Sequence, residues 1–145
     1  MLARQRPRLI TSLRPVEPGT SGGVTVAGIV ASAVGGATVG LASWTLGGSV
    51  RVLKLALLAG LFGSLLDSVL GATVQALYRC PICGSMTEHR RHPGCNARTT
   101  LVRGSSWVSN DVVNALSTSI AVACASRFDE RPCRLDRHQA RAARR

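Results

Sequence analysis

Three cysteines and one histidine, all side chains that bind metals well, fall within 16 residues of the sequence. Cys80 and Cys83 form a Cys-x2-Cys turn, and His92 and Cys95 follow as a second pair. Thiolate and imidazole ligands at such spacings are typical of structural zinc sites, in which four protein ligands form a tetrahedron. The sequence therefore predicts structural zinc here. His89 is an alternative nitrogen ligand, and the competing interpretations are free thiols or, in an oxidising compartment, a disulfide between Cys80 and Cys95.

Asp67 is the second candidate for a functional residue, because it is the single charged residue in the stretch Leu55–Leu77. At about 1.5 Å per residue, a helix of this stretch would extend roughly 34 Å, enough to cross the ~30 Å hydrocarbon core of a bilayer. The carboxylate would then lie near mid-membrane, where an Asp costs roughly 2.5–3.5 kcal/mol. We expect so costly a group to have a function and to face a partner helix.

Three oxygen-bearing residues, Asn110, Asp111 and Asn114, stand at the start of the last apolar stretch. As helix-capping residues they need no further role. The alternative is that they join Asp67 and Gln75 in holding Mg2+ and phosphate oxygens, since Mg2+ prefers oxygen ligands. On that hypothesis Asp67 and Asp111 are the candidate catalytic residues. The amide side chains of Gln75, Asn110 and Asn114 are candidate ligands of nucleotide, phosphate or Mg2+.

A glycine-rich turn, Glu17–Gly23, precedes the first apolar stretch. Successive backbone N–H groups in such turns bind anions, so Thr20 belongs to a candidate phosphate site. The turn matches no P-loop pattern, and a plain connection between segments is the competing interpretation.

Apolar helices must position these residues. Val24–Leu46 and Val112–Ser126 contain no charge, although the second stretch, at 15 residues, is short for a full crossing. The expected fold class is all-α, a polytopic integral membrane protein with about three transmembrane helices, a polar Cys/His loop and a basic tail. The expected segments are a basic Pro/Gly-rich segment 1–23, helices at about 24–46, 52–78 and 111–126, the loop 79–110, and a solvated or loosely helical tail 127–145.

Small residues recur along the first two predicted helices. The first carries Gly28, Ser32, Gly36 and Gly40, four residues apart, and the second carries Gly60, Gly63, Ser64, Asp67, Gly71 and Gln75. Such stripes let helix backbones approach closely. Because the connector 47–54 is short, the two helices should form an antiparallel hairpin, with Asp67 in a seam between helices. The stripes also predict a helical partner or a homo-oligomer.

The net charge of +11 arises from 18 Lys and Arg against 7 Asp and Glu, and lies outside the apolar stretches apart from Asp67. Basic segments next to membrane helices contact anionic lipid, so membrane lipid, and not nucleic acid, is the expected partner. Met1–Ser21 lacks the apolar core of a signal peptide, although its Arg-rich, acid-poor composition resembles a transit peptide.

Three ordered motifs, in residues 7–25, 60–75 and 107–114, resemble the transmembrane protein 19 family, the domain of unknown function 92 group. The resemblance covers about residues 7–126. Members of this polytopic membrane family include the plant phytyl-phosphate kinase, which is related to lipid-alcohol kinases that use CTP. Family members carry an earlier membrane half, with an Asp-Thr-x-Ala-Ser-Glu type motif, ahead of the stretch that begins at Leu9.

The resemblance implies a CTP-dependent isoprenoid-alcohol phosphate kinase in which Asp67 and Asp111 position Mg2+ and nucleotide. It also implies an integral membrane location, in the chloroplast envelope or an endomembrane. The alternative hypothesis is a non-enzymatic helical membrane module, or a truncated product, that packs with another subunit.

Overall fold

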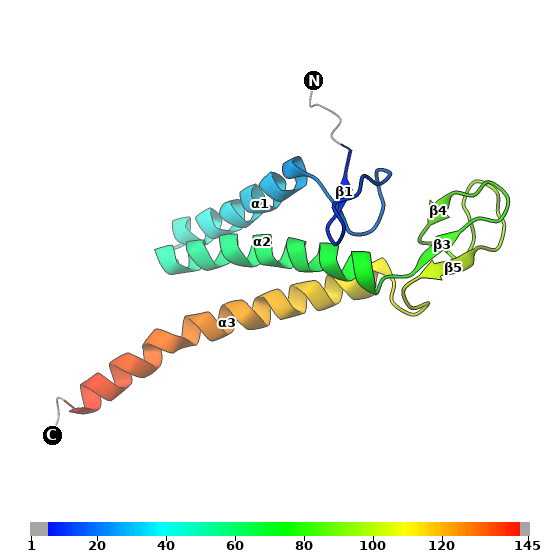
Figure 1. Cartoon of the computed structure of the whole chain (residues 1–145). Coiled ribbons are helices and arrows are strands. Elements are labelled where there is room, and N and C mark those ends of the chain that lie inside the picture. The colour runs from blue at the N-terminus through cyan, green and yellow to red at the C-terminus, as the bar shows by residue number, and fades with distance from the viewer. Residues whose placement is uncertain (1–5, 143–145) are drawn as a thin grey trace.

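The computed structural model describes residues 6–142, with side chains up to Phe128. Figure 1 shows three helices side by side, with a small sheet at the end where α2 finishes and α3 begins. The elements run in the order β1 (Arg8–Leu9), β2 (Gly23–Val24), α1 (Val26–Thr45), α2 (Val50–Thr73), β3 (Leu77–Arg79), β4 (Met86–Thr87), β5 (Thr100–Arg103) and α3 (Asn110–Ala142).

Helices α1 and α2 form the antiparallel hairpin that the short connector predicts. Thr25 caps α1, because its Oγ1 accepts a hydrogen bond from the Gly28 N–H at 3.0 Å. Ser49 caps α2 in the same way, with Val52 N–H as the donor at 3.4 Å. Gly47 takes a φ of +91°, a left-handed value that reverses the chain between the helices without steric cost. The capping residues therefore determine where α1 and α2 begin, and the turn at Gly47 determines where the chain reverses.

The small-residue stripe of α1 lies against α2. A Cβ added to Gly36 would lie 2.8 Å from the Ala56 carbonyl oxygen, and one added to Gly40 would lie 2.9 Å from Leu53 Cα. Ser32 Oγ donates a hydrogen bond to Ser64 Oγ at 2.8 Å in the same seam. The two backbones therefore approach as closely as glycine allows, which is the packing mode of helices in lipid.

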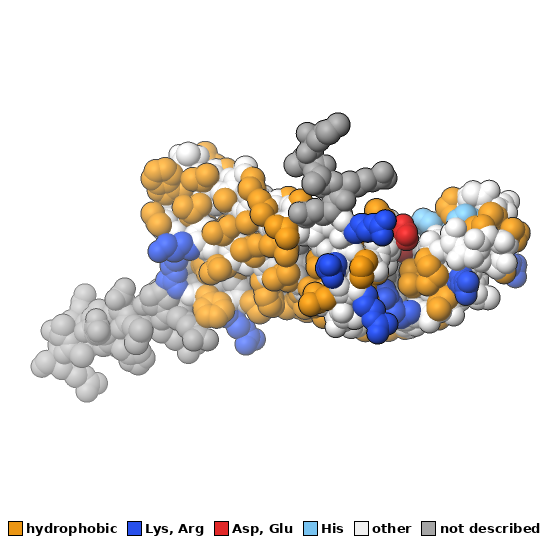
Figure 2. Space-filling view, turned by 45° about the horizontal axis from the view of Figure 1, so that its top comes forward, with side chains coloured by type: hydrophobic (Ala, Val, Ile, Leu, Met, Phe, Trp, Pro, Cys, Tyr) orange, Lys and Arg blue, Asp and Glu red, His pale blue; other side chains and the backbone are white. Residues whose placement is uncertain are grey.

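Two helices of the described residues, α1 and α2, are long and apolar enough to cross a membrane. Only 11% of the apolar stretch of each helix is buried by other parts of the chain. Figure 2 shows apolar side chains spread over the helical part of the surface. An exposed apolar surface of this extent is stable in lipid rather than in water, as a membrane protein requires.

Helix α3 packs along α2 and is longer than the predicted helix 111–126. Its backbone remains helical to Ala142, through most of the segment predicted as a solvated or loosely helical tail. Polar side chains alone do not end a helix, so the helix continues where the apolar pattern stops, and it also includes Pro132, a residue that normally weakens a helix interior. The apolar pattern marks where the helix stops being lipid-compatible and does not mark where it ends.

The all-α prediction holds for the helices but misses a three-stranded sheet in the Cys/His loop, where β3 pairs with both β4 and β5. Helix α2 ends at Thr73 and not near residue 78, so Gln75 lies beyond the helix. The Ala76 N–H donates to the Val108 carbonyl oxygen at 2.9 Å, and Tyr78 pairs with Leu101 in the sheet. These backbone bonds direct residues after Val74 into the sheet instead of another helical turn.

The N-terminal segment packs on the end of α2. Its strands β1 and β2 pair antiparallel, and Gly22 lies so close to α2 that an added Cβ would be 2.4 Å from Ala72 Cβ. The segment that precedes α1 and the sheet that follows α2 therefore meet at one end of the helices (Figure 1).

The α1–α2 seam gives a matched pair of substitutions. We expect Gly36→Ala to lower the free energy of unfolding by about 1–3 kcal/mol, because its Cβ must push the helices apart. Gly35→Ala should be neutral or stabilising by up to about 1 kcal/mol, since nothing lies within 4 Å of that Cβ position. Unfolding in mixed micelles of rising sodium dodecyl sulfate, followed by circular dichroism, measures both. Equal effects of the two substitutions would contradict this packing.

Candidate functional site

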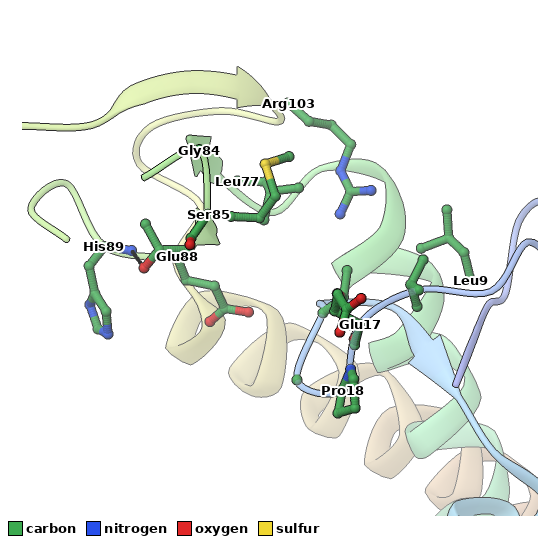
Figure 3. A pocket seen from close by; sticks show the side chains of 14 residues that line it. Leu9, Glu17, Pro18, Leu77, Gly84, Ser85, Glu88, His89 and Arg103 are labelled. Carbon is green, nitrogen blue, oxygen red and sulfur yellow. Dashed lines mark hydrogen bonds between the residues drawn. The ribbon is translucent and has the colours of Figure 1, made fainter. Parts of the chain in front are cut away.

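A cavity of 890 Å³ opens between the N-terminal segment and the Cys/His sheet. Glu17 and Thr20 line it from the N-terminal side, and Glu88, His89 and Arg103 line it from the sheet side. Figure 3 shows the Arg103 guanidinium and the Glu88 carboxylate directed into the space between the two segments. The cavity therefore combines cationic, anionic and hydroxyl groups at the polar end of the helices.

Two segments of the cavity wall are held together by polar contacts. The Ser21 hydroxyl donates a hydrogen bond to Glu88 Oε1, and Arg103 Nη2 donates to the Gly71 carbonyl oxygen at 3.1 Å. The same nitrogen lies 3.4 Å from the carbonyl oxygen of Ser21. Thr20, the predicted phosphate ligand, instead directs its Oγ1–H to the Glu17 carbonyl oxygen at 2.8 Å. The Glu17–Gly23 turn is thus stabilised partly by its own side chains.

Within the described part of the chain, two buried donors at this end have no hydrogen-bond acceptor. They are Nε2 of Gln75, a residue that is 2% exposed, and Nε of Arg103. Both side chains lie beside Gly71: Gln75 Oε1 is 3.2 Å from the Cβ position of Gly71, and Arg103 donates to its carbonyl group. A buried N–H without an acceptor costs about 1–3 kcal/mol, so a bound ligand with acceptor oxygens would be stabilised here.

Asp67 lies in the α2–α3 seam. Its Oδ1 is 3.2 Å from Ser117 Oγ, which is buried and also lies 3.1 Å from the Asn114 carbonyl oxygen. One hydroxyl proton can serve only one of these acceptors at a time. Gly63, one turn earlier, lies against Ala121, whose Cβ is 3.4 Å from the Gly63 Cβ position. The carboxylate therefore faces a partner helix, as its mid-helix position predicts.

The predicted oxygen ligands do not converge. Asn110, Asp111 and Asn114 are exposed at the start of α3, and the N–H of Val112 donates to Ser109 Oγ at 3.4 Å. Gln75 lies beside the N-terminal segment, whereas Asp67 bonds to α3. The described contacts therefore do not bring the proposed ligands together. Thr20 lines the cavity, Gln75 is buried near Gly71, and the other proposed ligands lie on α3 or in its seam with α2.

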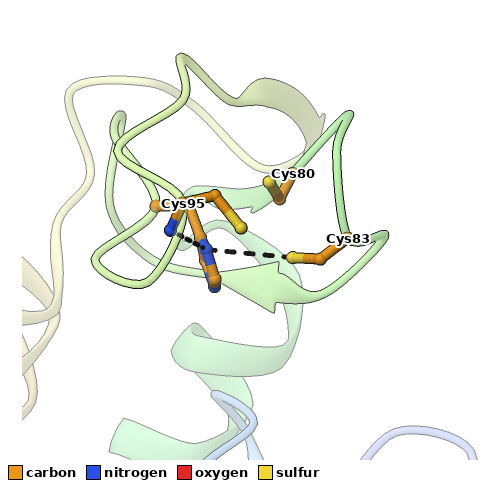
Figure 4. Close-up of side chains that lie close together, drawn as sticks. Cys80, Cys83 and Cys95 are labelled. Carbon is orange, nitrogen blue, oxygen red and sulfur yellow. Dashed lines mark hydrogen bonds between the residues drawn. The ribbon is translucent and has the colours of Figure 1, made fainter.

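The four predicted metal ligands do converge. The ligand atoms of Cys80, Cys83, His92 and Cys95 all lie within 4.8 Å of one another, and His89 is not in this group. Figure 4 shows the Cys80–Cys83 turn facing the turn that carries Cys95. Such a cluster of three thiols and one imidazole could hold a metal ion.

Local backbone geometry forms these two turns. After β3, the Cys80 N–H donates to the Ser85 carbonyl oxygen at 2.9 Å, and Gly84 turns the chain with a φ of +74°. In the second turn the Cys95 N–H donates to His92 Nδ1 at 3.2 Å. Nδ1 therefore acts as the acceptor nitrogen of the ring, and it also lies 3.8 Å from Cys83 Sγ. A metal ion bound through Nδ1 would take over the lone pair that now accepts the Cys95 N–H.

The thiols of Cys83 and Cys95 differ in acidity. Hydrogen bonds from the Ser85 hydroxyl and backbone N–H stabilise the Cys83 thiolate and lower its pKa from 9.0 to about 6. The hydrogen bond between Cys95 and Cys83 raises the pKa of Cys95 to about 11, and burial and the charge of the neighbouring thiolates act in the same direction. Cys83 is therefore mostly a thiolate near neutral pH, and the thiolate is the form of cysteine that binds metal ions.

Sequence reasoning missed three residues of these sites: Arg103, Glu88 and Ser117. Each is an ordinary polar residue whose partner lies far away in the chain, such as Ser21 for Glu88 and Asp67 for Ser117. The sequence Thr100–Arg103 has a composition that suits a strand, but its two apolar residues are adjacent and four residues are too few to predict a strand from periodicity.

The acidity of Cys83 predicts selective alkylation of the metal-free protein. At pH 7 a thiol with a pKa of about 6 carries roughly ten thiolates per thiol, so iodoacetamide should modify Cys83 well before Cys95. The rate should fall as the pH drops through about 6. Peptide mass spectrometry at a series of pH values measures this rate.

Ser85→Ala removes one hydrogen bond to the thiolate and should move the midpoint of Cys83 alkylation to higher pH. Ser106→Ala, in the same loop, is the control and should leave the midpoint unchanged. A midpoint near 9.0 in the unsubstituted protein would contradict the role of Ser85.

Comparison with known proteins gives the family. The model of the integral membrane protein DUF92 family matches residues 1–122. Protein PGR of Arabidopsis thaliana is 43% identical over 94 residues, 57% of this chain and 33% of that protein. An uncharacterized membrane protein of Methanocaldococcus jannaschii is 36% identical over 72 residues, 50% of this chain and 30% of that protein.

The chain spans about a third of the length of these curated relatives. No solved structure matches it. Because the family model covers most of the chain, the protein belongs to the DUF92 family of integral membrane proteins.

Proposed function

We propose that this chain forms the phosphate-facing part of a membrane kinase for isoprenoid-alcohol phosphates. The reaction class comes from the family resemblance, with CTP as phosphoryl donor and Mg2+ as its counter-ion. The observation that carries the proposal is Arg103, which lines the cavity of 890 Å³ and whose buried Nε has no acceptor among the described residues. Gln75 Nε2, near Gly71, likewise has none there. A guanidinium has five N–H donors in a planar fork that matches phosphate oxygens, so a phosphate would satisfy these groups.

The remaining roles follow from the chemistry of the side chains. Asp67 and Asp111 are the proposed Mg2+ ligands and catalytic residues, with Asn110, Asn114 and Thr20 as nucleotide or phosphate contacts. Asp67 precedes Gly71 by one helical turn, about 6 Å along α2. Binding of the substrate would have to draw the α3 start and the cavity together, because these groups are separate in the described contacts.

We also propose that α3 makes the third membrane crossing. It runs antiparallel along α2, from the Ala76–Val108 backbone bond at one end to the hydrogen bond of the Arg51 guanidinium to the Phe128 carbonyl oxygen at the other. Residues 110–128 would extend about 28 Å as a helix, close to the ~30 Å of the hydrocarbon core. The membrane would be the chloroplast envelope or an endomembrane, as the family resemblance implies.

We propose zinc as the metal of the Cys/His cluster. Three thiolates and one imidazole are the ligands of structural Cys3His sites, which leave no open position for a substrate. The ion would therefore stabilise the loop and take no part in catalysis.

A non-enzymatic membrane module is the second candidate function. The hydrogen bond between Ser117 and Asp67 favours it, because a carboxylate bonded in a helix seam could serve packing alone. The zinc cluster would then stabilise the loop, and a further subunit would cover the helices.

The two candidates predict different outcomes for Asp67→Asn. In the kinase, loss of the carboxylate should lower CTP-dependent phosphorylation of a prenyl phosphate by about 100-fold, without lowering membrane levels. Ser117→Ala is the matched control: it removes the hydrogen bond to Asp67 and keeps the charge, so most turnover should remain. Turnover is measured in proteoliposomes with Mg2+, CTP and phytyl phosphate.

Unchanged turnover in Asp67→Asn would reject the catalytic role of this residue. No turnover in the unsubstituted protein, together with lower stability of both variants, would favour the packing module.

Metal analysis tests the zinc proposal directly. We expect one zinc per chain in the purified protein and close to none after Cys83→Ser, because three ligands bind structural zinc far more weakly than four. Cys124→Ser is the control, since Cys124 is exposed on α3 and outside the cluster. Zinc should also slow alkylation of Cys83. Metal-free protein after purification without chelators would reject the site.

A further inference from the structure

An apolar groove of 250 Å³ lies between α2 and α3 at the end of the helices away from the sheet. The groove exists because the small side chains on both helices do not fill it, and larger apolar side chains form its borders. The groove is lined from α2 by Leu55, Ala59 and Phe62 and from α3 by Cys124, Ala125 and Phe128.

The position of the groove follows from the antiparallel packing of the two helices. Asp67 bonds to Ser117 towards the sheet end, whereas the Arg51 guanidinium donates to the Phe128 carbonyl oxygen at the opposite end. Leu55 lies one helical turn from Arg51. The groove therefore begins at the membrane boundary marked by Arg51 and continues towards the middle of α2.

Exposed basic residues lie near this end of both helices. Lys54 stands one helical turn before Leu58 of the groove lining, and Arg127 is next to the lining residue Phe128 in the chain. The single acid of α2 is Asp67, towards the sheet end, and Asp111 lies at the sheet end of α3, whereas Asp129 and Glu130 follow the groove residue Phe128 in the sequence. The segment 127–145 adds a net positive charge, with seven Arg against three Asp or Glu. Figure 2 shows Lys and Arg side chains bordering the apolar helical surface.

We propose that this groove binds one hydrocarbon chain of an anionic phospholipid, and that Lys54 and Arg127 contact its headgroup. The lining takes up hydrocarbon, and the flanking cations match a negative headgroup at the bilayer surface. The nearby basic residues favour an anionic lipid over a second copy of the chain, because a second copy would bring the same positive charges to this end of the helices.

This site is independent of the proposed kinase reaction. The cavity with Arg103 lies at the sheet end of α2, and the groove lies at the other end. A lipid bound in the groove would belong to the opposite leaflet from a substrate whose phosphate occupies the cavity. Loss of kinase activity would leave this proposal intact, and its own failure would leave the kinase proposal intact.

Lipid retention tests the proposal. The full chain is reconstituted in vesicles of equal parts phosphatidylglycerol and phosphatidylcholine, extracted in mild detergent, and examined by native mass spectrometry. We expect phosphatidylglycerol to be retained about 30-fold over phosphatidylcholine, because each of the two cations contributes about 1 kcal/mol and 1.4 kcal/mol corresponds to a factor of ten. Lys54→Gln combined with Arg127→Gln should bring this ratio close to one without touching the helix packing.

Cys124→Phe should fill the groove and lower retention of both lipids. Its matched control is Val39→Phe, on the exposed face of α1, and the control for charge is Arg98→Gln in the Cys/His loop. Circular dichroism and zinc content confirm that each variant is folded. Equal retention of the two lipids, or an unchanged ratio in the charge variant, would overturn the proposal. A dimer that Cys124→Phe converts to a monomer would assign the groove to a second copy and overturn it as well.

Discussion

The close contact of three backbone segments at the C-terminal end of α2 is the constraint on which the rest of the structure depends. Gly22 approaches Ala72 from the N-terminal segment, and Gly104 approaches Gln75 so closely that an added Cβ would lie 2.0 Å from the Gln75 carbonyl oxygen. Both glycines also have positive φ, which other residues rarely adopt. A side chain at either position would therefore clash with α2 or the residues after it and would strain the backbone. The contact sets where the cavity opens, where the sheet begins and where α3 starts to run back along α2.

The two seams of α2 show how lipid changes the packing rules. Outward faces of the helices are apolar, so burial of apolar surface does not drive the helices together, and close backbone contact and hydrogen bonds must do so. The α1 seam uses Gly36 and a hydrogen bond between Ser32 and Ser64. The α3 seam contains the carboxylate of Asp67 bonded to Ser117. Since polar groups in hydrocarbon must be satisfied by protein, both seams direct their polar atoms inward.

Local patterns predicted the hairpin, the glycine stripe and the four residues of the Cys/His cluster, because each depends on spacing along a short stretch of chain. The ends of α2 and the sheet were not predicted. Leu77 pairs with Arg103 and Tyr78 with Leu101, and these pairs join segments separated by the whole Cys/His loop. Strands of two to four residues carry too little alternation to be recognised, and their stability comes from contacts that a single sequence does not reveal. Arg103 was therefore missed as a cavity residue, and Gln75 was assigned to a helix.

The cavity and the Cys/His cluster are structurally connected, because residues of the same sheet contribute to both. Leu77 begins β3 and pairs with Arg103, and Cys80 directly follows the end of the same strand. Cys80 is buried, and its N–H bond to Ser85 holds the turn that carries Cys83. An ion held by the cluster would therefore restrain β3 and, through its pairing with β5, the position of the Arg103 guanidinium. A metal ion in the cluster would thus restrain one wall of the cavity through the sheet, without itself lining the cavity.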